Sequence, residues 1–294
     1  MKLLLFSRRG VVHAVDELRR TFAAIARYGF DFVVNKEFAE TIRALGAAQI
    51  PAEKEYDSAA CPVADGDDAV MVCYGGDGTL LEGIRMLGGA PVPVVGINAG
   101  HMGFLTGGRK EAIEELFGEI ARGSLRIEQR TMLHIEGCVE GMPQGALAVN
   151  EAAVQRSGAG MISVECYVDD QQVATYYGDG VIVSTPTRST AYSLSAGGPV
   201  VAPGCRCLVI SPLAPHNLTM RPVVVPDTSC VMLRVRTRRS AVTLSLDNTA
   251  YDVADETEIR VSLSEKRIFL GQAHNISFYD TLRDKMMWGV DIRD

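Results

Sequence analysis

Apolar strand-like runs alternate with amphipathic helical stretches through the first hundred residues of the chain. A short apolar run at Leu3–Phe6 is followed by apolar residues on one helix face, and Gly29 then ends the helical pattern: Val15, Leu18, Phe22, Ile25 and Ala26. The alternation continues with strand-like runs at 32–34, 69–73 and 92–97 and helical stretches at 38–45 and 79–87. Strands joined by helices pair in parallel through right-handed crossovers. We therefore expect an open α/β domain with a mostly parallel sheet.

Short strand-like runs separated by turn residues replace this alternation after about residue 125. They alternate apolar with polar side chains and are rich in β-branched residues, as in 163–168, 230–237, 242–247 and 258–263. Such runs are typical of sandwich strands, and no further helix of useful length is expected before about 279–288. The sequence therefore predicts an α/β domain over 1–125 and an all-β sandwich over 126–274. The polar residues 51–68 are expected to form a mobile surface connection.

The composition limits the partners of the chain. Its 294 residues carry a net charge of −7, whereas a protein that grips nucleic acid through phosphates is normally basic. No apolar run approaches the roughly 20 residues that span a bilayer, and the first residues are expected to form a strand rather than a signal peptide. Seven cysteines, mostly within apolar runs, indicate reduced thiols. We therefore expect a cytoplasmic protein with no membrane or nucleic-acid partner.

Three glycines stand within four residues directly after the apolar run at 69–73, in Gly75-Gly76-Asp77-Gly78-Thr79. Glycine lets a ligand approach the main chain closely, and the start of the next helix offers unpaired N–H groups and a positive dipole end to a phosphate. A tight strand-to-helix turn capped by Asp77 is the plain structural alternative. Because a carboxylate repels phosphate, its place in the turn indicates a base or a magnesium partner. The turn matches neither the Walker pattern nor G-x-G-x-x-G.

This turn resembles the signature shared by NAD kinases, diacylglycerol-type lipid kinases and, more distantly, phosphofructokinases. Later segments narrow the resemblance to the NAD kinase family of the bacterial type, which uses ATP or polyphosphate. These segments are 96–105 (GINAGHMGFL), Val149-Asn150-Glu151, 178–199 (GDGVIVSTPTRSTAYSLSAGGP), 211–216 (SPLAPH) and Arg221-Pro222. The matches run in the family's order from about residue 70 to residue 222.

The resemblance implies an enzyme that moves a phosphoryl group from ATP or polyphosphate, with Mg²⁺, to the adenosine-ribose 2′-hydroxyl of NAD. It implies that a final segment of about 275–294 returns to the α/β domain. It also implies a homodimer or homotetramer with the NAD site between domains, completed by a neighbouring subunit. A lipid kinase of the same superfamily and a nucleotide-binding sensor with weak or no turnover are the alternatives. The sequence leaves the metal ligands and the choice of donor open.

The resemblance also implies roles for single residues. Asp77 would be the base that faces the 2′-hydroxyl, and donor phosphates would lie against Gly75, Gly76, Gly78 and Thr79. The adenine pocket would be lined by Asn150, Thr187, Thr190 and Ala191, with Phe104 as an apolar wall. Glu151 would hold the nicotinamide ribose, Tyr192 and Ser195 would lie near the 2′ position, and Asp179 would reach the nicotinamide end across a subunit contact. Taken singly, strand-end pairing or an ordinary helix start would explain several of these residues.

The chain departs from the family pattern at Arg188, where the family has glycine in Pro-Thr-Gly-Ser-Thr. If the position needs a positive φ, arginine costs about 1 kcal/mol or more. If it only allows close approach, the guanidinium either crowds the ligand or adds a phosphate contact. We expect crowding or strain, so that Arg188→Gly improves the use of NAD. A second departure, Asp247-Asn248 in place of Asp-Gly, is mild because asparagine tolerates the left-handed conformation.

Overall fold

A computed structural model describes residues 1–60, 63, 66–98, 103–106, 108–237, 241–272 and 277–287 of the chain. The chain divides into two compact units, Met1–Gln129 with Ile268–Asp294, and Arg130–Arg267. The first change of unit falls at 129, and composition placed it at about 125; the second falls at 268, and the family resemblance placed it at about 275. The strands β7 (Arg126–Gly137) and β18 (Glu258–Gln272) each continue through a change of unit without a break.

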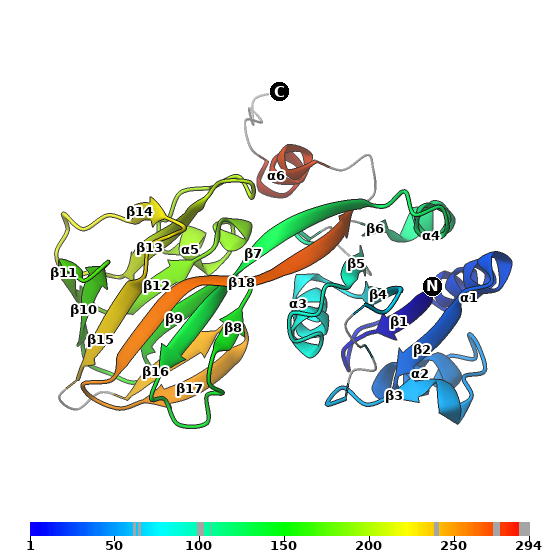
Figure 1. Cartoon of the computed structure of the whole chain (residues 1–294), viewed down its shortest axis with the longest axis horizontal. Helices are drawn as coiled ribbons and strands as arrows, with labels where there is room; N and C mark the ends of the chain where they lie inside the picture. Colours follow the sequence, from blue (N-terminus) through cyan, green and yellow to red (C-terminus); the bar gives the residue numbers. More distant parts are fainter. Residues whose placement is uncertain are drawn as a thin grey trace. The chain divides into compact units, whose positions relative to one another are not determined.

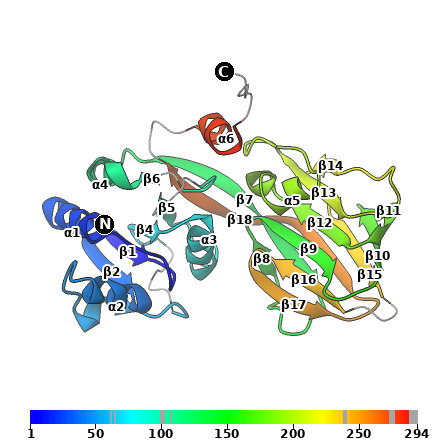
Figure 2. The same ribbon diagram turned by 180° about the vertical axis from the view of Figure 1, so that it is seen from behind.

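The first unit is built on a parallel sheet with the strand order β5-β4-β1-β2-β3. In Figures 1 and 2 strand β1 lies between β2 and β4. The short strand β6 and the end of β18 each pair in parallel with β5. The strands are β1 (Lys2–Phe6), β2 (Asp31–Asn35), β3 (Glu55–Tyr56), β4 (Ala69–Tyr74), β5 (Pro93–Asn98) and β6 (Gly108–Arg109).

Helices cover both faces of this sheet. Apolar side chains of α1, α2 and α4 share one core cluster with Leu3, Leu5, Val70 and Val72. On the opposite face, Gly83 of α3 lies close to Phe6, Met71 and Cys73. The chain therefore leaves β1 and β4 toward opposite faces of the sheet. The helices are α1 (Val15–Tyr28), α2 (Lys36–Ala44), α3 (Asp77–Met86), α4 (Ile113–Ala121) and α6 (Phe278–Met286), with 3₁₀ turns η1 (Ala52–Lys54) and η2 (Lys110–Ala112).

The second unit is a β-sandwich. One sheet has the antiparallel order β14-β13-β12-β9-β16-β17, and the other contains β11, β10, β15 and the first part of β18, with β7 and β8. Their inner faces form one core cluster, to which Val154 and Leu244 contribute from one sheet and Val164 and Leu233 from the other. Besides β7 and β18, the elements are β8 (Ala146–Ala148), β9 (Glu151–Arg156), β10 (Ile162–Val168), β11 (Gln171–Gly178), β12 (Gly180–Ser184), η3 (Pro186–Arg188), α5 (Tyr192–Ser195), β13 (Cys207–Leu213), β14 (Val223–Pro226), β15 (Val231–Arg236), β16 (Val242–Leu246) and β17 (Thr249–Val253).

The expected fold class is confirmed, and one local prediction is wrong. Residues 51–68 are not a loose connection throughout, because they contain η1 and β3. Strand β3 pairs in parallel with β2, and Tyr56 is buried. Arg43 of α2 also donates to the Glu55 carboxylate at 2.5 Å and to the Ile50 carbonyl at 3.1 Å. Contacts with α2 and β2 therefore order residues whose own sequence is polar and turn-rich.

Candidate active site

The glycine turn connects β4 to α3 in the first unit. Gly75 has a φ of 151°, and a Cβ there would lie 2.4 Å from Thr79 Oγ1, so the position requires glycine. Gly76 precedes α3, and its carbonyl accepts from the N–H groups of Thr79 and Leu80 at 2.9 and 3.2 Å. The side chain of Thr79 is buried, whereas Gly76 is exposed. An exposed glycine backbone at the start of a helix of this length suits an anion.

The carboxylate of Asp77 is fixed by the main chain of a neighbouring loop. Its Oδ2 accepts from the N–H of Phe104 at 3.0 Å, and its Oδ1 accepts from the N–H of Leu105 at 3.1 Å. Gly103 allows this approach, because a Cβ there would stand 1.7 Å from Asp77 Oδ1. A half-buried carboxylate that is held next to such a turn can orient a hydroxyl and accept its proton.

Phe104 lies beside Asp77 and helix α6. The centroid of its ring is 6.4 Å from that of Phe278, and the Nζ of Lys285 lies 5.2 Å from the Phe104 centroid. These contacts are all within the first unit, and the role of Phe104 as a wall of the adenine pocket stays a prediction. Residues 99–102 of the same family segment, and Trp288 with the chain end, lie outside the described residues.

The Asn150-Glu151 pair lies in the second unit, where β9 begins, and Asp247 holds it from the β16–β17 turn. Asp247 Oδ2 accepts from the N–H of Val149 at 2.9 Å, and Oδ1 accepts from those of Asn150 and Glu151 at 2.7 and 3.4 Å. The left-handed residue of this turn is Asp247, with a φ of 50°, and not Asn248 as the sequence led us to expect. The Asp247 carboxylate therefore fixes the main chain of the predicted NAD-binding segment through three consecutive N–H groups.

Several predicted binding residues of the second unit come together with polar atoms that have no protein partner. The Thr185 N–H and hydroxyl donate to the carbonyls of Asn150 and Val149, both at 2.8 Å, which ties the segment after β12 to the start of β9. Among the predicted binding residues that the structure describes, four buried atoms lack a hydrogen-bond partner in the protein: Asn150 Oδ1, Glu151 Oε2, Thr187 Oγ1 and Thr190 Oγ1. Buried polar groups are almost always paired, so these atoms point to a polar ligand.

Burial and, to a smaller extent, the neighbouring Asp247 carboxylate raise the pKa of Glu151, and the Arg188 guanidinium opposes both effects. The pKa that results is about 7. The pKa of Asp247 is also raised by burial, while its three backbone donors and then Arg188 lower it. Arg188 therefore serves both buried carboxylates as a counter-charge.

The backbone of Arg188 is not strained. The residue ends the 3₁₀ turn η3, and its φ is not positive. Its N–H donates to the Thr185 carbonyl at 3.3 Å, and its carbonyl accepts from the N–H of Ala191 at 2.9 Å. The conformational cost that a left-handed position would impose is therefore absent.

Asp179 and Tyr192, two further predicted binding residues of the second unit, each form a side-chain hydrogen bond with strand β9. Arg156 of β9 donates to both carboxylate oxygens of Asp179, at 2.6 and 3.3 Å. The Tyr192 hydroxyl donates to Gln155 Oε1 at 2.9 Å. Burial raises the pKa of Tyr192, and the charges of Asp179 and Glu151 raise it further, so these three groups share one electrostatic environment. Ala191 is half-buried and precedes α5, and Ser195 is exposed at the end of that helix.

Sequence reasoning missed the residues that hold the predicted ones in place. Asp247 acts on main-chain groups 96 to 98 positions away, Gly103 admits Asp77, and Arg156 pairs with Asp179. A carboxylate in a hairpin turn gives no signal of so distant a partner. Only the family's Asp-Gly pattern at this turn marked the position of Asp247.

Among the described residues, no helix is long and apolar enough to cross a membrane. Across the same residues, no three or more His, Cys, Asp or Glu side chains gather in a way that could hold a metal ion.

Comparison with known proteins gives matches along most of the chain. Residues 4–125 match the family model of the ATP-NAD kinase N-terminal domain, and residues 149–270 match that of the ATP-NAD kinase C-terminal domain. The NAD kinase of Christiangramia forsetii is 33% identical over 298 residues, which cover 100% of both chains.

Two solved structures are similar to the whole fold. An NAD kinase from Archaeoglobus fulgidus in complex with ATP is 25% identical, with a TM-score of 0.72 and 98% of each chain covered. The yeast NADH kinase complexed with NADH is 22% identical, with a TM-score of 0.84 and coverage of 99% of this chain and 89% of that one. At this identity, the second likeness concerns the fold alone.

Proposed function

The chain belongs to the NAD kinase family and is an enzyme that phosphorylates NAD, and we propose that ATP is its donor and the adenosine-ribose 2′-hydroxyl its acceptor. The observation that carries the proposal is the Asp77 carboxylate, which two backbone N–H groups hold at the start of α3, directly after the glycine turn. Neither a lipid kinase nor a sensor without turnover is favoured by the family matches.

Asp77 acts as the base for the 2′-hydroxyl. Phosphoryl transfer passes through a loose transition state, so positioning and charge stabilisation dominate the catalysis. A carboxylate is too weak a base to ionise a ribose hydroxyl beforehand. It orients the oxygen and accepts the proton late, while the new P–O bond forms and the bond from phosphorus to the leaving diphosphate breaks. The fixed position of Asp77 supports this role.

The glycine turn receives the donor, and the second unit receives NAD. Gly75, Gly76, Gly78 and Thr79 offer backbone and hydroxyl donors to phosphate oxygens. Asn150, Thr187, Thr190 and Ala191 bind adenine, and Phe104 provides an apolar wall. Glu151 accepts from the nicotinamide ribose, Tyr192 and Ser195 lie near the 2′ position, and Asp179 binds the nicotinamide end. The four buried atoms without protein partners support the adenine and ribose assignments.

Mg²⁺, a cytoplasmic location and a homodimer or homotetramer complete the proposal. Mg²⁺ is usually held by one or two carboxylates together with substrate phosphates and waters. Bound to the donor phosphates, the ion would neutralise charge on the transferred group. The six described cysteines form no disulfide with one another, which supports a reducing location.

The function is tested with the purified chain, NAD, Mg²⁺ and either ATP or inorganic polyphosphate. NADP is detected by its reduction with an NADP-specific dehydrogenase. We expect NADP to form with ATP and in proportion to enzyme. If no NADP formed with either donor, the proposed activity would be refuted. If NADP formed with polyphosphate but not with ATP, the proposal that ATP is the donor would be refuted.

A further inference from the structure

The peptide that leads into the glycine turn is held on both sides. It joins Tyr74, the last residue of β4, to Gly75, whose N–H donates to the Ile97 carbonyl of β5 at 2.9 Å. The carbonyl of the same peptide, that of Tyr74, accepts from the Ser7 hydroxyl at 2.7 Å. Because Gly75 has a φ of 151°, the chain changes direction directly after this peptide. The glycine turn therefore starts from a peptide whose orientation is fixed by two hydrogen bonds.

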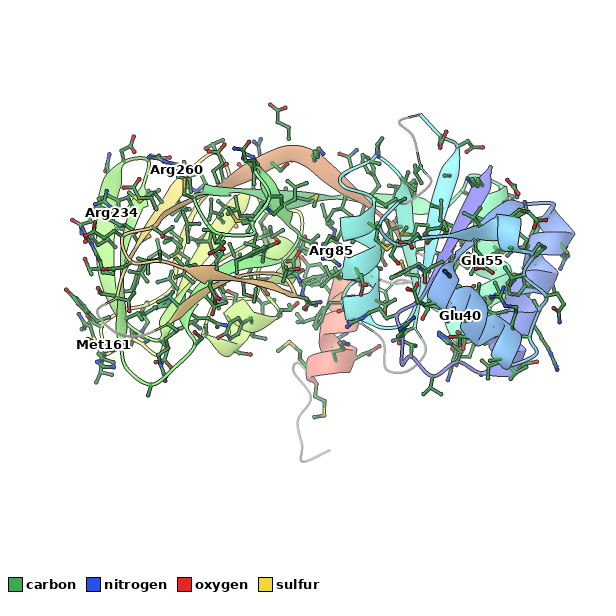
Figure 3. All side chains as sticks on the ribbon, turned by 90° about the horizontal axis from the view of Figure 1, so that it is seen from below. Glu40, Glu55, Arg85, Met161, Arg234 and Arg260 are labelled. Carbon is green, nitrogen blue, oxygen red and sulfur yellow. The ribbon has the colours of Figure 1, made fainter. Side chains whose placement is uncertain are left out.

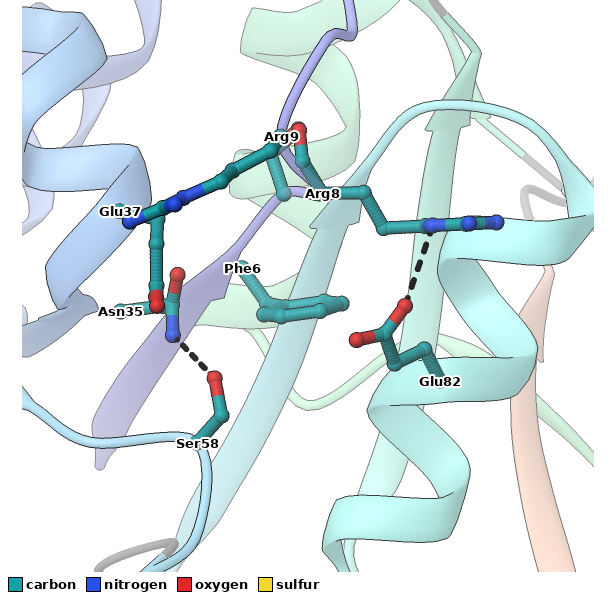
Figure 4. A pocket seen from close by; sticks show the side chains of 8 residues that line it. Phe6, Arg8, Arg9, Asn35, Glu37, Ser58 and Glu82 are labelled. Carbon is teal, nitrogen blue, oxygen red and sulfur yellow. Dashed lines mark hydrogen bonds and ion pairs between the residues drawn. The ribbon is translucent and has the colours of Figure 1, made fainter. Parts of the chain in front are cut away.

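The hydroxyl of Ser7 stands where the pairing between β1 and β4 stops. Strand β1 pairs in parallel with β4 as far as Phe6 and ends there. The chain then leaves the sheet, and the side chains of Arg8 and Arg9 extend to opposite sides, toward α3 and α2 (Figure 4). A longer β1 would offer a main-chain donor to the Tyr74 carbonyl. Ser7 supplies a side-chain donor in its place.

The direction of the Ser7 O–H bond is set by His13. The His13 Nε2 lies 2.9 Å from Ser7 Oγ, and both side chains are buried. A serine hydroxyl has one hydrogen. The Tyr74 carbonyl at 2.7 Å receives it in preference to the Arg8 carbonyl at 3.5 Å, so His13 donates its Nε2–H to Ser7 Oγ. The His13 Nδ1 is buried without a hydrogen-bond partner, and burial lowers the pKa of this ring, which keeps it neutral near pH 7.

The side chain of Tyr74 has a separate hydrogen bond, which provides a control. Its ring is fully buried and packs beside His13, with the ring centroids 6.4 Å apart. Its hydroxyl lies 2.7 Å from Thr21 Oγ1 of α1, and Thr21 is buried as well. Thr21 therefore supports the Tyr74 side chain, whereas Ser7 supports the Tyr74 carbonyl. A substitution of either residue removes one of these bonds and leaves the other.

We propose that Ser7 is a positioning residue for phosphoryl transfer, which holds the first peptide of the glycine turn while His13 orients its hydroxyl. The inference rests on the proposed function, in which this turn receives the donor phosphates and carries Asp77. Without the Ser7 hydroxyl, the buried Tyr74 carbonyl has lost its donor, and the peptide is free to rotate toward another one. A rotation there displaces the backbone donors of the turn and Asp77 together. Phosphoryl transfer is sensitive to such displacement because it depends on positioning.

Steady-state kinetics of Ser7→Ala and Ser7→Thr, with Thr21→Val as the matched control, test the inference. Ser7→Ala removes the donor to the Tyr74 carbonyl, whereas Ser7→Thr keeps it. We expect Ser7→Ala to lower kcat/KM for ATP roughly tenfold, with a KM for NAD within about twofold of the parent. Ser7→Thr and Thr21→Val should both keep kcat/KM for ATP within about threefold of the parent. A surface control, Arg85→Ala on the exposed side of α3 (Figure 3), should change neither parameter.

Two variants of His13 test its part in the arrangement. His13→Leu removes the donor to Ser7 Oγ, so we expect kcat/KM for ATP to fall about threefold. The amide of His13→Gln can donate from a position close to that of Nε2, and this variant should stay near the parent. The same kcat/KM in both variants would show that His13 does not orient Ser7.

Hydrogen exchange of the Gly75 N–H provides a readout without turnover. Ser7→Ala should speed this exchange roughly tenfold relative to both the parent and Thr21→Val, because the peptide before Gly75 is no longer held on its carbonyl side. A parent chain that makes no NADP would refute the proposed function, and this measurement would still test the Ser7 bond.

Three results would overturn the inference. The first is a kcat/KM for ATP in Ser7→Ala within about twofold of the parent. The second is an equal loss in Ser7→Ala and Thr21→Val, which would make the bond merely structural. The third is an equal rise in the KM for NAD and the KM for ATP. Unfolding free energy is measured for each variant. If Ser7→Ala does not fold, Ser7→Cys replaces it with the same expected direction, since a thiol is only a weak donor.

Discussion

Replacing Arg188 by glycine is expected to weaken NAD binding near neutral pH, with a loss that disappears at higher pH. From the sequence alone, crowding or strain at Arg188 predicted an improvement instead. The structure changes this expectation, because η3 is unstrained and the guanidinium opposes the burial and the Asp247 charge that raise the pKa of Glu151. Without Arg188, Glu151 stays protonated to higher pH and loses acceptor capacity for a ribose hydroxyl.

The size of the effect follows from the pKa of Glu151. At about 7, this pKa leaves roughly half of the carboxyl ionised at pH 7. A nearby opposite charge lowers a carboxyl pKa by roughly 1 to 3. At the lower end of that range, removal of Arg188 reduces the ionised fraction at pH 7 from about one half to about one tenth. The KM for NAD should therefore rise about fivefold at pH 7, with little difference above about pH 9.

The assay is the KM for NAD between pH 6 and pH 9.5 in the parent, Arg188→Gly, Arg188→Gln and Arg188→Lys. Arg188→Gln should show the same KM as Arg188→Gly, because neither side chain carries a positive charge. Arg188→Lys should show a KM close to that of the parent, because lysine keeps the positive charge. A KM ratio between Arg188→Gly and the parent that is constant with pH would refute the electrostatic reasoning. A lower KM in Arg188→Gly at pH 7 would show that crowding dominates.

Three further variants test other parts of the site. The folded-state pKa of Glu151 is raised from 4.5 to about 7, so the free energy of unfolding falls as pH rises through this range. Glu151→Gln should therefore increase the free energy of unfolding by as much as about 3 kcal/mol at pH 8 and by little at pH 4.5. If chemical denaturation gave the same increase in unfolding free energy at both pH values, this reasoning about the Glu151 charge would be contradicted. Gly75→Ala should lower the free energy of unfolding by about 1–3 kcal/mol, because its Cβ would meet Thr79. In the control Gly76→Ala the new Cβ meets nothing within 4 Å, so the loss should be smaller. Equal losses in the two variants would refute the steric argument. Asp179→Ala should weaken NAD binding in calorimetry but change stability by less than about 1 kcal/mol, and mass measurement should find at least a dimer, which a fully active monomer would contradict.

The sequence predicted the parts of the fold that local patterns specify. Apolar residues at helical spacing and Gly29 located α1, whose C-terminal glycine has a φ of 67°. Strand β3 was missed because two residues carry no periodicity, and pairing with β2 and contacts with α2 order them from a distance. Local patterns therefore gave the long elements but not the short, contact-dependent one.

The same distinction applies to the site. Asp77 could be predicted because its turn, its strand and its helix are adjacent in the sequence. The joint environment of Asp247, Arg188 and Glu151 could not be predicted, because it forms only when the ends of β9, β12 and β16 meet. The effect of Arg188 on activity changes sign with this environment, so single-residue reasoning about crowding was insufficient.

The account depends most directly on Asp77 as the base, and the turnover of Asp77→Asn tests this claim. Asparagine cannot take the proton, and its carbonyl can accept only part of what the carboxylate accepts from Phe104 and Leu105. Unfolding free energy and NAD affinity are therefore measured beside kcat. We predict a kcat lower by about 10²-fold or more, with NAD affinity within about threefold of the parent. A folded Asp77→Asn variant whose kcat is within about threefold of the parent would contradict the account.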